Sequence, residues 1–268
     1  MIEKLDIYCI TNKRLLAVED TNYKLAGVGL EDLPEEYLKC NIGDNIFYKE
    51  KHYSELTFQY WYWKNILNEN SKDWVGFCQK RRFWINKDSS GKKINLENFK
   101  NHILQEVPKE WNGKEAILCD PIDVSNLKKM KLLKRGFKSI IKDPRILFDK
   151  KKRTINLHFD MYHGHGNLDK AIQVMNLEDR NEFLDYVKTS TSYNPHVMFI
   201  AKPNIHNKWF DTLFPWLLRC EKIFGLKELH GYDTGRLYAY LAERYLSFWF
   251  KKYTNYLNWP WVFYEFKD

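Results

Sequence analysis

Three consecutive cations follow a short apolar segment of the chain. Residues 74–78 read Trp-Val-Gly-Phe-Cys, which is typical of a buried strand, and Gln79 separates them from Lys80, Arg81 and Arg82. In open α/β sheets, ligands bind beyond the carboxyl ends of the strands. Arginine side chains can also donate two parallel hydrogen bonds to a phosphate group. The segment therefore predicts a site for a phosphorylated ligand, and ordinary solvated surface charge is the alternative.

A second segment combines two histidines with glycine. His163 and His165 are separated by Gly164, and Gly166 and Asn167 follow. Two histidines at this spacing could bind a metal, but no third ligand accompanies them at a fixed spacing. The glycines would let the backbone approach a ligand closely. The alternative is a loop that leads into a helix capped by Asn167.

A third segment places carboxylates near the C-terminal part of the chain. Asp233 lies between two glycines, Arg236 follows, and Glu243 and Arg244 lie within an otherwise apolar helical pattern. A carboxylate beside a hydroxyl group could act as a general base, and Arg236 could bind a phosphate. For Glu243 and Arg244 the alternative is a structural ion pair.

The elements that must position these residues alternate between strands and helices, which predicts an α/β fold with a parallel or mixed sheet. In the helix expected at 55–67, Ser54 is a candidate N-cap and Leu56, Tyr60, Trp63 and Leu67 recur at helical spacing. Strands are expected at residues 5–11, 74–78, 115–119 and 197–201, and further helices near 96–107, at 209–224 and at 237–253.

Composition restricts the class of protein. The 268 residues fit one large domain, or a core domain with a small appendage. The number of cysteines is odd and none are close in sequence, which excludes a regular disulfide framework or zinc pattern and favours a reducing compartment. The five are Cys9, Cys40, Cys78, Cys119 and Cys220. The sequence has no signal-peptide pattern and no apolar run of the ~18 residues that a membrane span needs, so we expect a cytoplasmic protein.

The formal net charge of +8 indicates an anionic partner. A nucleotide diphosphate, a nucleic acid and an acidic membrane surface would all qualify, and solubility alone is the alternative. Residues 126–156 are rich in lysine and arginine and predict a basic surface insertion, with a solvated face as the alternative. This insertion and the aromatic C-terminal residues could contact anionic lipid at the inner membrane, although core packing is favoured for the aromatic residues.

Several segments match a known family in the same order along nearly the whole chain. They are residues 53–65, residues 75–83, Gly166-Asn167-Leu168-Asp169, Met198-Phe199-Ile200, Phe214-Pro215-Trp216-Leu217 and residues 241–249. The chain resembles the capsular-polysaccharide-synthesis family of bacterial glycosyltransferases, long catalogued as a domain of unknown function. The family has His-Tyr where this chain has Gln79-Lys80, and an acidic pair where it has Gly166-Asn167, so family roles at those positions do not carry over.

The resemblance implies a GT-A-like, Rossmann-like α/β fold, with a mixed sheet flanked by helices, in one glycosyltransferase domain spanning residues 1–268. It implies that a sugar passes from a nucleotide-diphosphate sugar, expected to be a UDP-sugar, to a glycan or lipid-linked glycan of a capsular or other surface polysaccharide. The candidate donor-binding residues are Thr11, Lys80, Arg81, Arg82 and Arg236. The candidate catalytic residues are Asp233 and Glu243. The candidate acceptor-binding or sugar-binding residues are His163, His165, Asp169 and His196.

GT-A enzymes usually end a central strand in an Asp-x-Asp motif that binds a divalent metal. Here the corresponding strand ends in residues 78–81 without a carboxylate, which indicates that lysine and arginine neutralise the diphosphate directly. We therefore expect no divalent metal, and Asp120 and Asp123 are the candidate ligands for Mn or Mg if one is required.

Two rival interpretations belong to other classes of protein. A nucleic-acid-binding module would use the positive charge and the aromatic residues for stacking. The chain lacks a recognised motif of that kind, and its aromatic residues lie at helical core spacing, so we expect no nucleic-acid partner. The second rival is a non-catalytic scaffold of a polysaccharide assembly complex. Donor hydrolysis or transfer in vitro would separate these rivals from an enzyme.

Overall fold

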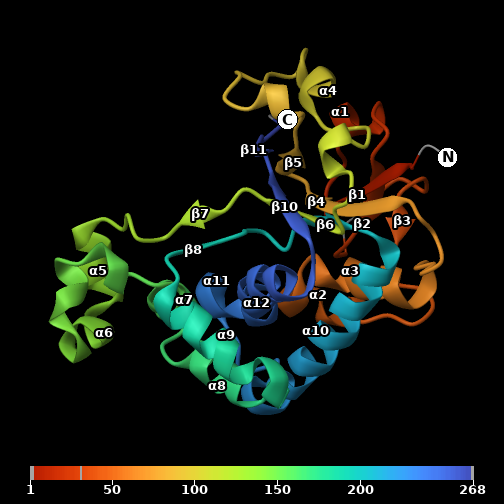
Figure 1. Cartoon of the computed structure of the whole chain (residues 1–268). Helices are drawn as coiled ribbons and strands as arrows, with labels where there is room; N and C mark the ends of the chain where they lie inside the picture. Colours follow the sequence, from red (N-terminus) through yellow and green to blue (C-terminus); the bar gives the residue numbers. More distant parts are fainter. Residues whose placement is uncertain (1–2, 31, 267–268) are drawn as a thin grey trace. The chain divides into compact units, whose positions relative to one another are not determined.

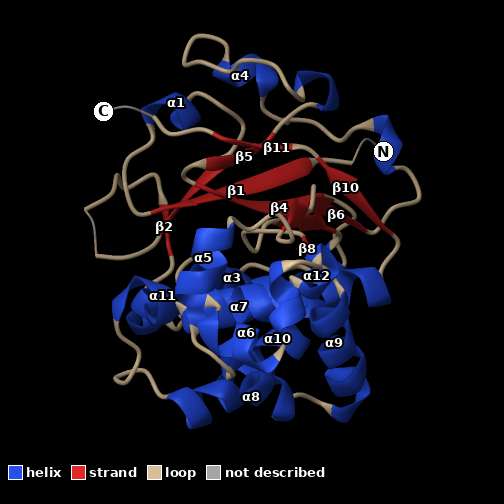
Figure 2. Ribbon diagram, turned by 90° about the vertical axis from the view of Figure 1, so that its left-hand side faces the viewer, coloured by secondary structure: helices blue, strands red, loops and turns tan. Residues whose placement is uncertain are grey.

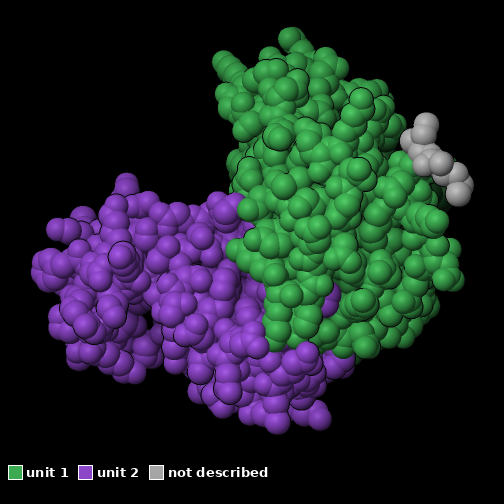
Figure 3. All heavy atoms as spheres, viewed as in Figure 1, with its two compact units in different colours: residues 1–120, 196–212, 250–268 green, residues 121–195, 213–249 purple. Residues whose placement is uncertain are grey.

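The computed structural model of the chain describes residues 3–30 and 32–266. These residues fall into two units, coloured separately in Figure 3. Unit 1 comprises residues 1–120, 196–212 and 250–268, and unit 2 comprises residues 121–195 and 213–249. The basic insertion expected at 126–156 lies within unit 2. That the chain forms one glycosyltransferase domain stays a prediction.

Unit 1 is built on a mixed sheet. Its strands lie in the order β10 (Tyr256–Trp259), β6 (Ala116–Cys119), β9 (Phe199–Ala201), β4 (Trp74–Gln79), β1 (Leu5–Thr11), β2 (Lys24–Gly27) and β3 (Leu38–Lys39). Strands β3, β2, β1 and β4 run parallel to one another, and β9 runs antiparallel to both β4 and β6. Two short strands, β5 (Arg82–Trp84) and β11 (Trp261–Phe263), pair with each other, and β5 also pairs with β4. The strands predicted at 5–11, 74–78 and 115–119 are therefore present.

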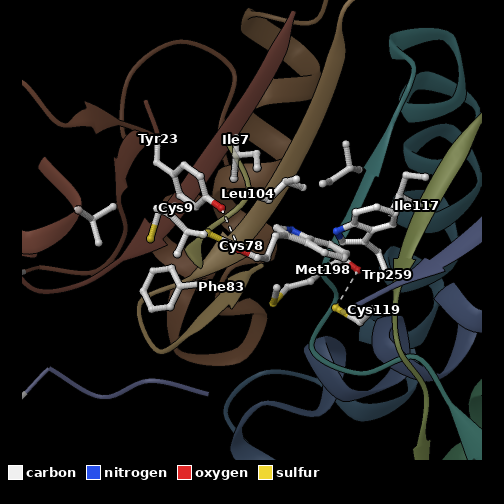
Figure 4. Close-up of a cluster of buried hydrophobic side chains, with 14 of the residues drawn as sticks. Ile7, Cys9, Tyr23, Cys78, Phe83, Leu104, Ile117, Cys119, Met198 and Trp259 are labelled. Carbon is white, nitrogen blue, oxygen red and sulfur yellow. Dashed lines mark hydrogen bonds between the residues drawn. The ribbon is translucent and has the colours of Figure 1, made fainter. Parts of the chain in front are cut away.

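Unit 1 has helices of its own on both faces of this sheet (Figure 2). On one face, Tyr8 of β1 packs on Phe58 and Tyr62 of α3 (Leu56–Asn65), with ring centroids 5.4 and 5.3 Å apart. On the other face, Phe83 contacts Phe99 of α4 (Phe99–His102) with centroids 4.9 Å apart. The same face holds a buried cluster that includes Ile7, Cys9, Cys78, Cys119 and Trp259 (Figure 4). Alternate residues of β1 thus face the two layers, as period-two side chains must. Unit 1 also contains α1 (Leu16–Glu19) and α2 (Glu50–Tyr53).

The residues that recur at helical spacing in the aromatic helix are not all buried, although Leu56 is. Tyr60 and Trp63 are half-buried and bond to polar side chains, whereas Phe58 and Tyr62 point toward the sheet. Ser54 is not an N-cap either. It ends α2 with φ of 52°, and α3 begins at Leu56 without a side-chain cap. Several faces of an aromatic helix are apolar, so the spacing alone did not select the face that meets the sheet.

Two other predicted elements are shorter than expected. Around residues 96–107 only α4 forms, because the backbone of Leu104 donates to Trp84 O and residue 103 bridges residue 85 instead of continuing a helix. The strand expected at 197–201 begins at Phe199, because His196 and Val197 have positive φ.

Unit 2 is helical, with a two-stranded sheet formed by β7 (Ile122–Asp123) and β8 (Ser192–Tyr193). Its helices are α5 (Lys129–Arg135), α6 (Phe137–Lys142), α7 (Ile155–His163), α8 (Asn167–Gln173), α9 (Leu177–Thr189) and α11 (Gly231–Gly235). Helices α10 (Pro203–Phe224) and α12 (Leu237–Tyr253) contribute residues to both units. Inside unit 2, Phe183, Trp216 and Tyr245 form an aromatic core with ring centroids 5.1–6.3 Å apart. Among the described residues, none of the helices is long and apolar enough to cross a bilayer.

Candidate functional site

The carboxyl ends of β1, β2 and β4 meet at one edge of the sheet. In the parallel ladders Thr11 pairs with Gly27, and Ile10 pairs with Gln79. After Gln79 the chain turns sharply, because Gln79 and Arg82 form an antiparallel pair between β4 and β5. Lys80 and Arg81 therefore lie at the tip of this turn. We call residues 79–82 the cationic turn.

The cationic turn is tied to the end of β1. The ammonium group of Lys80 donates a hydrogen bond to Oδ1 of Asn12, and its backbone N–H donates to Ile10 O at 3.1 Å. Thr11 is buried. Its hydroxyl donates a hydrogen bond to Lys13 O and accepts one from the backbone N–H of Lys13. Thr11 thus shapes the loop after β1, while Asn12, which the sequence did not single out, positions Lys80.

Arg81 and Arg82 are half-buried side chains with fixed orientations. Arg81 Nη1 lies 3.0 Å from Oε1 of Glu265, and Arg82 Nη1 donates to Oε1 of Gln79 at 3.1 Å. Both guanidinium groups lie within 6 Å of the centroid of the Phe263 ring, at 5.8 and 5.6 Å. Three cations thus gather at this edge of the sheet, and the Glu265 carboxylate contacts one of them, Arg81.

A strained segment adjoins the cationic turn. His196 and Val197 have φ of 76° and 52°, which costs about 1–3 kcal/mol for residues other than glycine. Two buried amides capture their carbonyl groups: Gln79 Nε2 donates to His196 O at 2.6 Å, and Gln59 Nε2 donates to Val197 O at 3.1 Å. The His196 ring meets the Trp261 ring edge-on, with centroids 4.7 Å apart. Of these residues the sequence identified only His196. Gln59 could have been found from the sequence, because it is an amide side chain within the aromatic run 58–63.

A cavity of about 220 Å³ lies at the carboxyl ends of β2 and β3. Gly27, Gly29, Lys39, Cys40 and Phe47 are among the residues that line it. Because Thr11 pairs with Gly27, this cavity opens at the same edge of the sheet as the end of β1. Gly29 has φ of 82°, a conformation that side chains other than glycine rarely adopt.

The cationic turn does not fit a divalent metal. It offers one amide and three cations, whereas Mn²⁺ and Mg²⁺ require carboxylate, carbonyl or water oxygens. Over residues 3–30 and 32–266 no group of three His, Cys, Asp or Glu is arranged to bind a metal ion. Asp120 belongs to unit 1 and Asp123 to unit 2. The Asp123 carboxylate accepts hydrogen bonds from Ser125 and Asn126, and the Ser125 bonds lower its pKa.

Unit 2 brings a second group of predicted residues together. His163 ends α7, and its Nδ1 lies 3.1 Å from the backbone O of Asp233 in α11, so Nδ1 carries the proton. The His163 ring stacks on Tyr240 with centroids 3.7 Å apart. The Asp233 carboxylate is half-exposed and lies 3.0 Å from Nη1 of Arg135, which comes from α5.

Glu243 and Arg244 form a buried ion pair on α12. The Arg244 side chain is 1% exposed, its guanidinium lies over the Tyr193 ring at 3.9 Å, and its Nη2 lies 3.3 Å from Nδ1 of His158. Burial, and then the charge of Arg244, lower the pKa of both His158 and His163 to about 3, so both rings are neutral at pH 7.

The remaining predicted residues have other surroundings. His165 Nδ1 lies 3.0 Å from Oδ2 of Asp160, whose Oδ1 accepts from the backbone of Gly166. Burial raises the pKa of the Asp160 carboxyl, a residue that the sequence analysis missed. Asp169 lies 3.5 Å from Lys188 on the surface, and Arg236 is an exposed residue that ends α11.

The suggested cap Asn167 instead donates to His163 O at 2.9 Å and closes the end of α7. The predicted residues thus form two groups. Thr11, Lys80, Arg81, Arg82 and His196 gather in unit 1, while Asp233, His163 and the Glu243–Arg244 pair gather in unit 2.

Comparison with protein families decides the relationship of the chain. A family described as "Domain of unknown function (DUF4422)" matches residues 6–255, most of the sequence. The chain belongs to the DUF4422 family. No curated protein matches this DUF4422 chain significantly in a comparison of sequences.

A solved structure shares the fold of this DUF4422 chain. It is the apo structure of WbbM, described as a bifunctional glycosyltransferase, with a TM-score of 0.68 and 18% sequence identity over 99% of this chain. The chain spans about half of that protein, 46% of its length. The likeness concerns the fold, and it confirms the predicted GT-A-like α/β class with a mixed sheet flanked by helices. The S. cerevisiae mannosyltransferase Ktr4p matches 91% of the chain and 66% of its own length at 12% identity, but its TM-score of 0.30 supports no argument.

Proposed function

We propose that the chain is a glycosyltransferase that moves a sugar from a nucleotide-diphosphate sugar to a glycan acceptor. The cationic turn at the carboxyl end of β4 carries this proposal, because it gathers three positive charges at the sheet edge where α/β proteins bind ligands. The donor is expected to be a UDP-sugar, and the acceptor a glycan or lipid-linked glycan of a capsular or other surface polysaccharide. The chain would work in the cytoplasm.

The chemistry of transfer explains why cations suit this position. When the bond between the sugar and the diphosphate breaks, negative charge develops on the departing phosphate oxygen. Lys80, Arg81 and Arg82 would stabilise that charge, and their partners Asn12, Gln79 and Glu265 already fix their orientation. Charged donors that are oriented before the reaction need little reorganisation while it proceeds, which is the main source of electrostatic catalysis.

The nucleoside would occupy the neighbouring cavity at the ends of β2 and β3. This cavity lies beside the end of β1, and its glycines allow a flat ring to approach the backbone. Thr11 would support the donor through the loop that it shapes, and Arg236 stays a further candidate for the phosphates. Asp233 would act as the general base toward the acceptor hydroxyl, with Glu243 second. His163, His165, Asp169 and His196 are proposed for the acceptor or the transferred sugar.

Nucleotide binding tests the proposal directly. Calorimetry with UDP, GDP, ADP and UMP should show a preference for a nucleoside diphosphate, and for UDP among them. Replacing Arg81 or Arg82 by alanine should weaken UDP binding by about 1.5–3 kcal/mol for each lost charge-assisted contact. Arg145→Ala is the matched control, because Arg145 is an exposed arginine of unit 2 paired with Asp143. Unchanged UDP affinity in both test variants would contradict the donor site.

The metal dependence of transfer is a second, independent test of the cationic turn. Because cations occupy the turn, transfer should continue in excess chelator. Loss of transfer that manganese or magnesium restores would refute this and direct attention to Asp120 and Asp123. Transfer of a sugar from a UDP-sugar to a polysaccharide fragment, followed by product analysis, would then establish the activity itself.

A further inference from the structure

The positive charge of the chain is concentrated in one segment. Residues 126–156 contain twelve lysine and arginine residues and two aspartates, a formal charge of +10. The whole chain carries +8, so all other residues together carry −2. Eleven of the twelve cations are exposed, and the exception is Arg153. The charge therefore marks one surface rather than the protein as a whole.

This basic segment is folded. Helix α5 packs against α6 and α7, and Leu132, Ile140, Ile146, Leu157 and Met161 form a buried cluster beneath it. The buried guanidinium of Arg153 donates to the carbonyl groups of Ser125, Ile146 and Leu147 at 3.0–3.1 Å, which ties the two ends of the segment together. Figure 1 shows α5 and α6 beside each other in unit 2.

The outer side of the segment exposes apolar side chains that its own cluster does not use. Met130 is 83% exposed and Phe148 81% exposed. The exposed apolar residues are Met130, Leu133, Phe137, Ile141 and Phe148, all more than half exposed. Five such residues within 19 positions concentrate exposed apolar side chains on this one segment. We call them the apolar ridge.

We propose that the apolar ridge and the lysines around it dock on the surface of an anionic lipid bilayer. Lysine ammonium groups are attracted to anionic headgroups, while aliphatic and phenyl side chains gain by entering the boundary of the acyl chains. Electrostatic attraction or apolar insertion alone gives weak membrane binding, whereas the two together give stable binding. The docking surface rests on these residues and does not depend on the proposed transferase activity.

The composition of the surface favours lipid over nucleic acid. Nine of the twelve cations are lysines, which act as point charges. A nucleic acid would present phosphates and base edges to this surface, and the side chains of the apolar ridge would then stay exposed to water. Arg135, an exposed cation of the segment, pairs with Asp233 of α11 and lies 4.8 Å from the centroid of the Tyr162 ring. The basic segment therefore contacts helix α11, which holds the proposed general base.

Vesicle binding tests the proposal on the full chain. The protein should co-sediment with phosphatidylcholine vesicles that contain about 30% phosphatidylglycerol, and much less with phosphatidylcholine alone. Binding should weaken as NaCl rises from about 0.1 M to about 0.5 M, because salt screens exposed charges. Equal affinity for the two vesicles, or tighter binding to duplex DNA or RNA than to anionic vesicles at the same salt, would overturn the proposal.

Two sets of substitutions separate charge from apolar contact. Replacing Lys131, Lys134 and Lys138 together by glutamine should weaken binding about a hundredfold, from about fivefold for each lysine. The combination Phe137→Ser and Phe148→Ser should weaken it at least about tenfold. Every substituted side chain is exposed, so thermal unfolding should be nearly unchanged. The matched controls are Lys93, Lys100 and Lys109 to glutamine, and Leu96 and Leu177 to serine, all exposed residues outside the segment.

A fluorescent probe locates the contact. All five native cysteines are buried, so an introduced cysteine can be labelled selectively. A polarity-sensitive dye on Ile141→Cys should shift to the blue on anionic vesicles, and the same dye on Leu177→Cys should not. A shift at residue 177 without one at residue 141 would show that another surface binds the membrane and would refute the docking surface proposed here.

Discussion

Oδ2 of Asp233 and Nη1 of Arg135 lie 3.0 Å apart, which joins the glycine-flanked helix α11 to the basic segment. Both side chains are more than a third exposed, with side-chain exposures of 49% and 39%, and exposed ion pairs contribute at most about 1 kcal/mol to stability. This modest contribution makes the proposed catalytic role of Asp233 testable without loss of the fold.

We expect Asp233→Asn to keep both stability and donor affinity and to lower turnover by ~10²–10⁴-fold, the usual contribution of a general base. Initial rates of transfer at saturating donor measure the effect, and Asp185→Asn, an exposed aspartate of α9, is the control. Transfer at nearly the wild-type rate would remove Asp233 from the mechanism. Retention of the anomeric configuration would remove the need for such a base.

The opposite result is expected at Glu243. Its side chain is 12% exposed and pairs with Arg244, which is 1% exposed. Glu243→Gln leaves a buried guanidinium without its carboxylate, so the free energy of unfolding should fall by about 3–5 kcal/mol. Urea denaturation measures the change against Glu97→Gln, a control at an exposed loop residue. A variant as stable as the wild type but inactive in transfer would instead make Glu243 catalytic.

Buried histidines should make stability depend on pH. The pKa of His158 and of His163 is lowered to about 3, and burial lowers that of His206 to about 4. The unfolded chain binds protons at these histidines below its ordinary pKa of about 6.5, whereas the folded chain does not. Their stabilising effect is therefore present above about pH 6.5 and is lost as the pH falls toward 3 to 4.

Between pH 7.5 and about pH 5, each of these histidines should lower the free energy of unfolding by about 2 kcal/mol. Urea denaturation at the two pH values measures the difference. His206→Phe should reduce the pH dependence by about a third, because one of the three groups is removed. An unchanged free energy of unfolding between the two pH values would show that these rings are protonated in the folded protein.

The strained segment before β9 depends on Gln59. Its amide donates to Val197 O at 3.1 Å, and Gln59 is 1% exposed. Gln59→Leu leaves that carbonyl without this bond, so we expect a loss of about 1–3 kcal/mol in the free energy of unfolding. Gln173→Leu, at an exposed position of α8, is the control. A Gln59→Leu variant as stable as the control variant would show that neighbouring contacts alone fix the backbone at Val197.

Much of the fold followed from local pattern. The strand Leu5–Thr11 and the helix Leu237–Tyr253 have the predicted bounds, because each is a continuous run whose residues favour one structure. The three cations after β4 were also recognisable, since a buried strand that ends in charge marks a sheet edge. Cys9, Cys78 and Cys119 lie in the apolar runs that form β1, β4 and β6, where free cysteine packs as a small apolar side chain, and all three are buried.

Only the tertiary structure decided how distant residues combine. The sequence singled out Lys80 and His196 as candidate binding residues, but only the fold shows that Asn12 contacts the Lys80 side chain and that Gln79 holds the backbone of His196. Likewise, composition showed that residues 126–156 are basic, but folding decided that Leu132 and Ile140 face inward while Met130 and Ile141 face solvent. The physical reason is that spacing along the chain specifies local backbone structure, whereas burial depends on which elements pack together, and contacts far apart in sequence determine that packing.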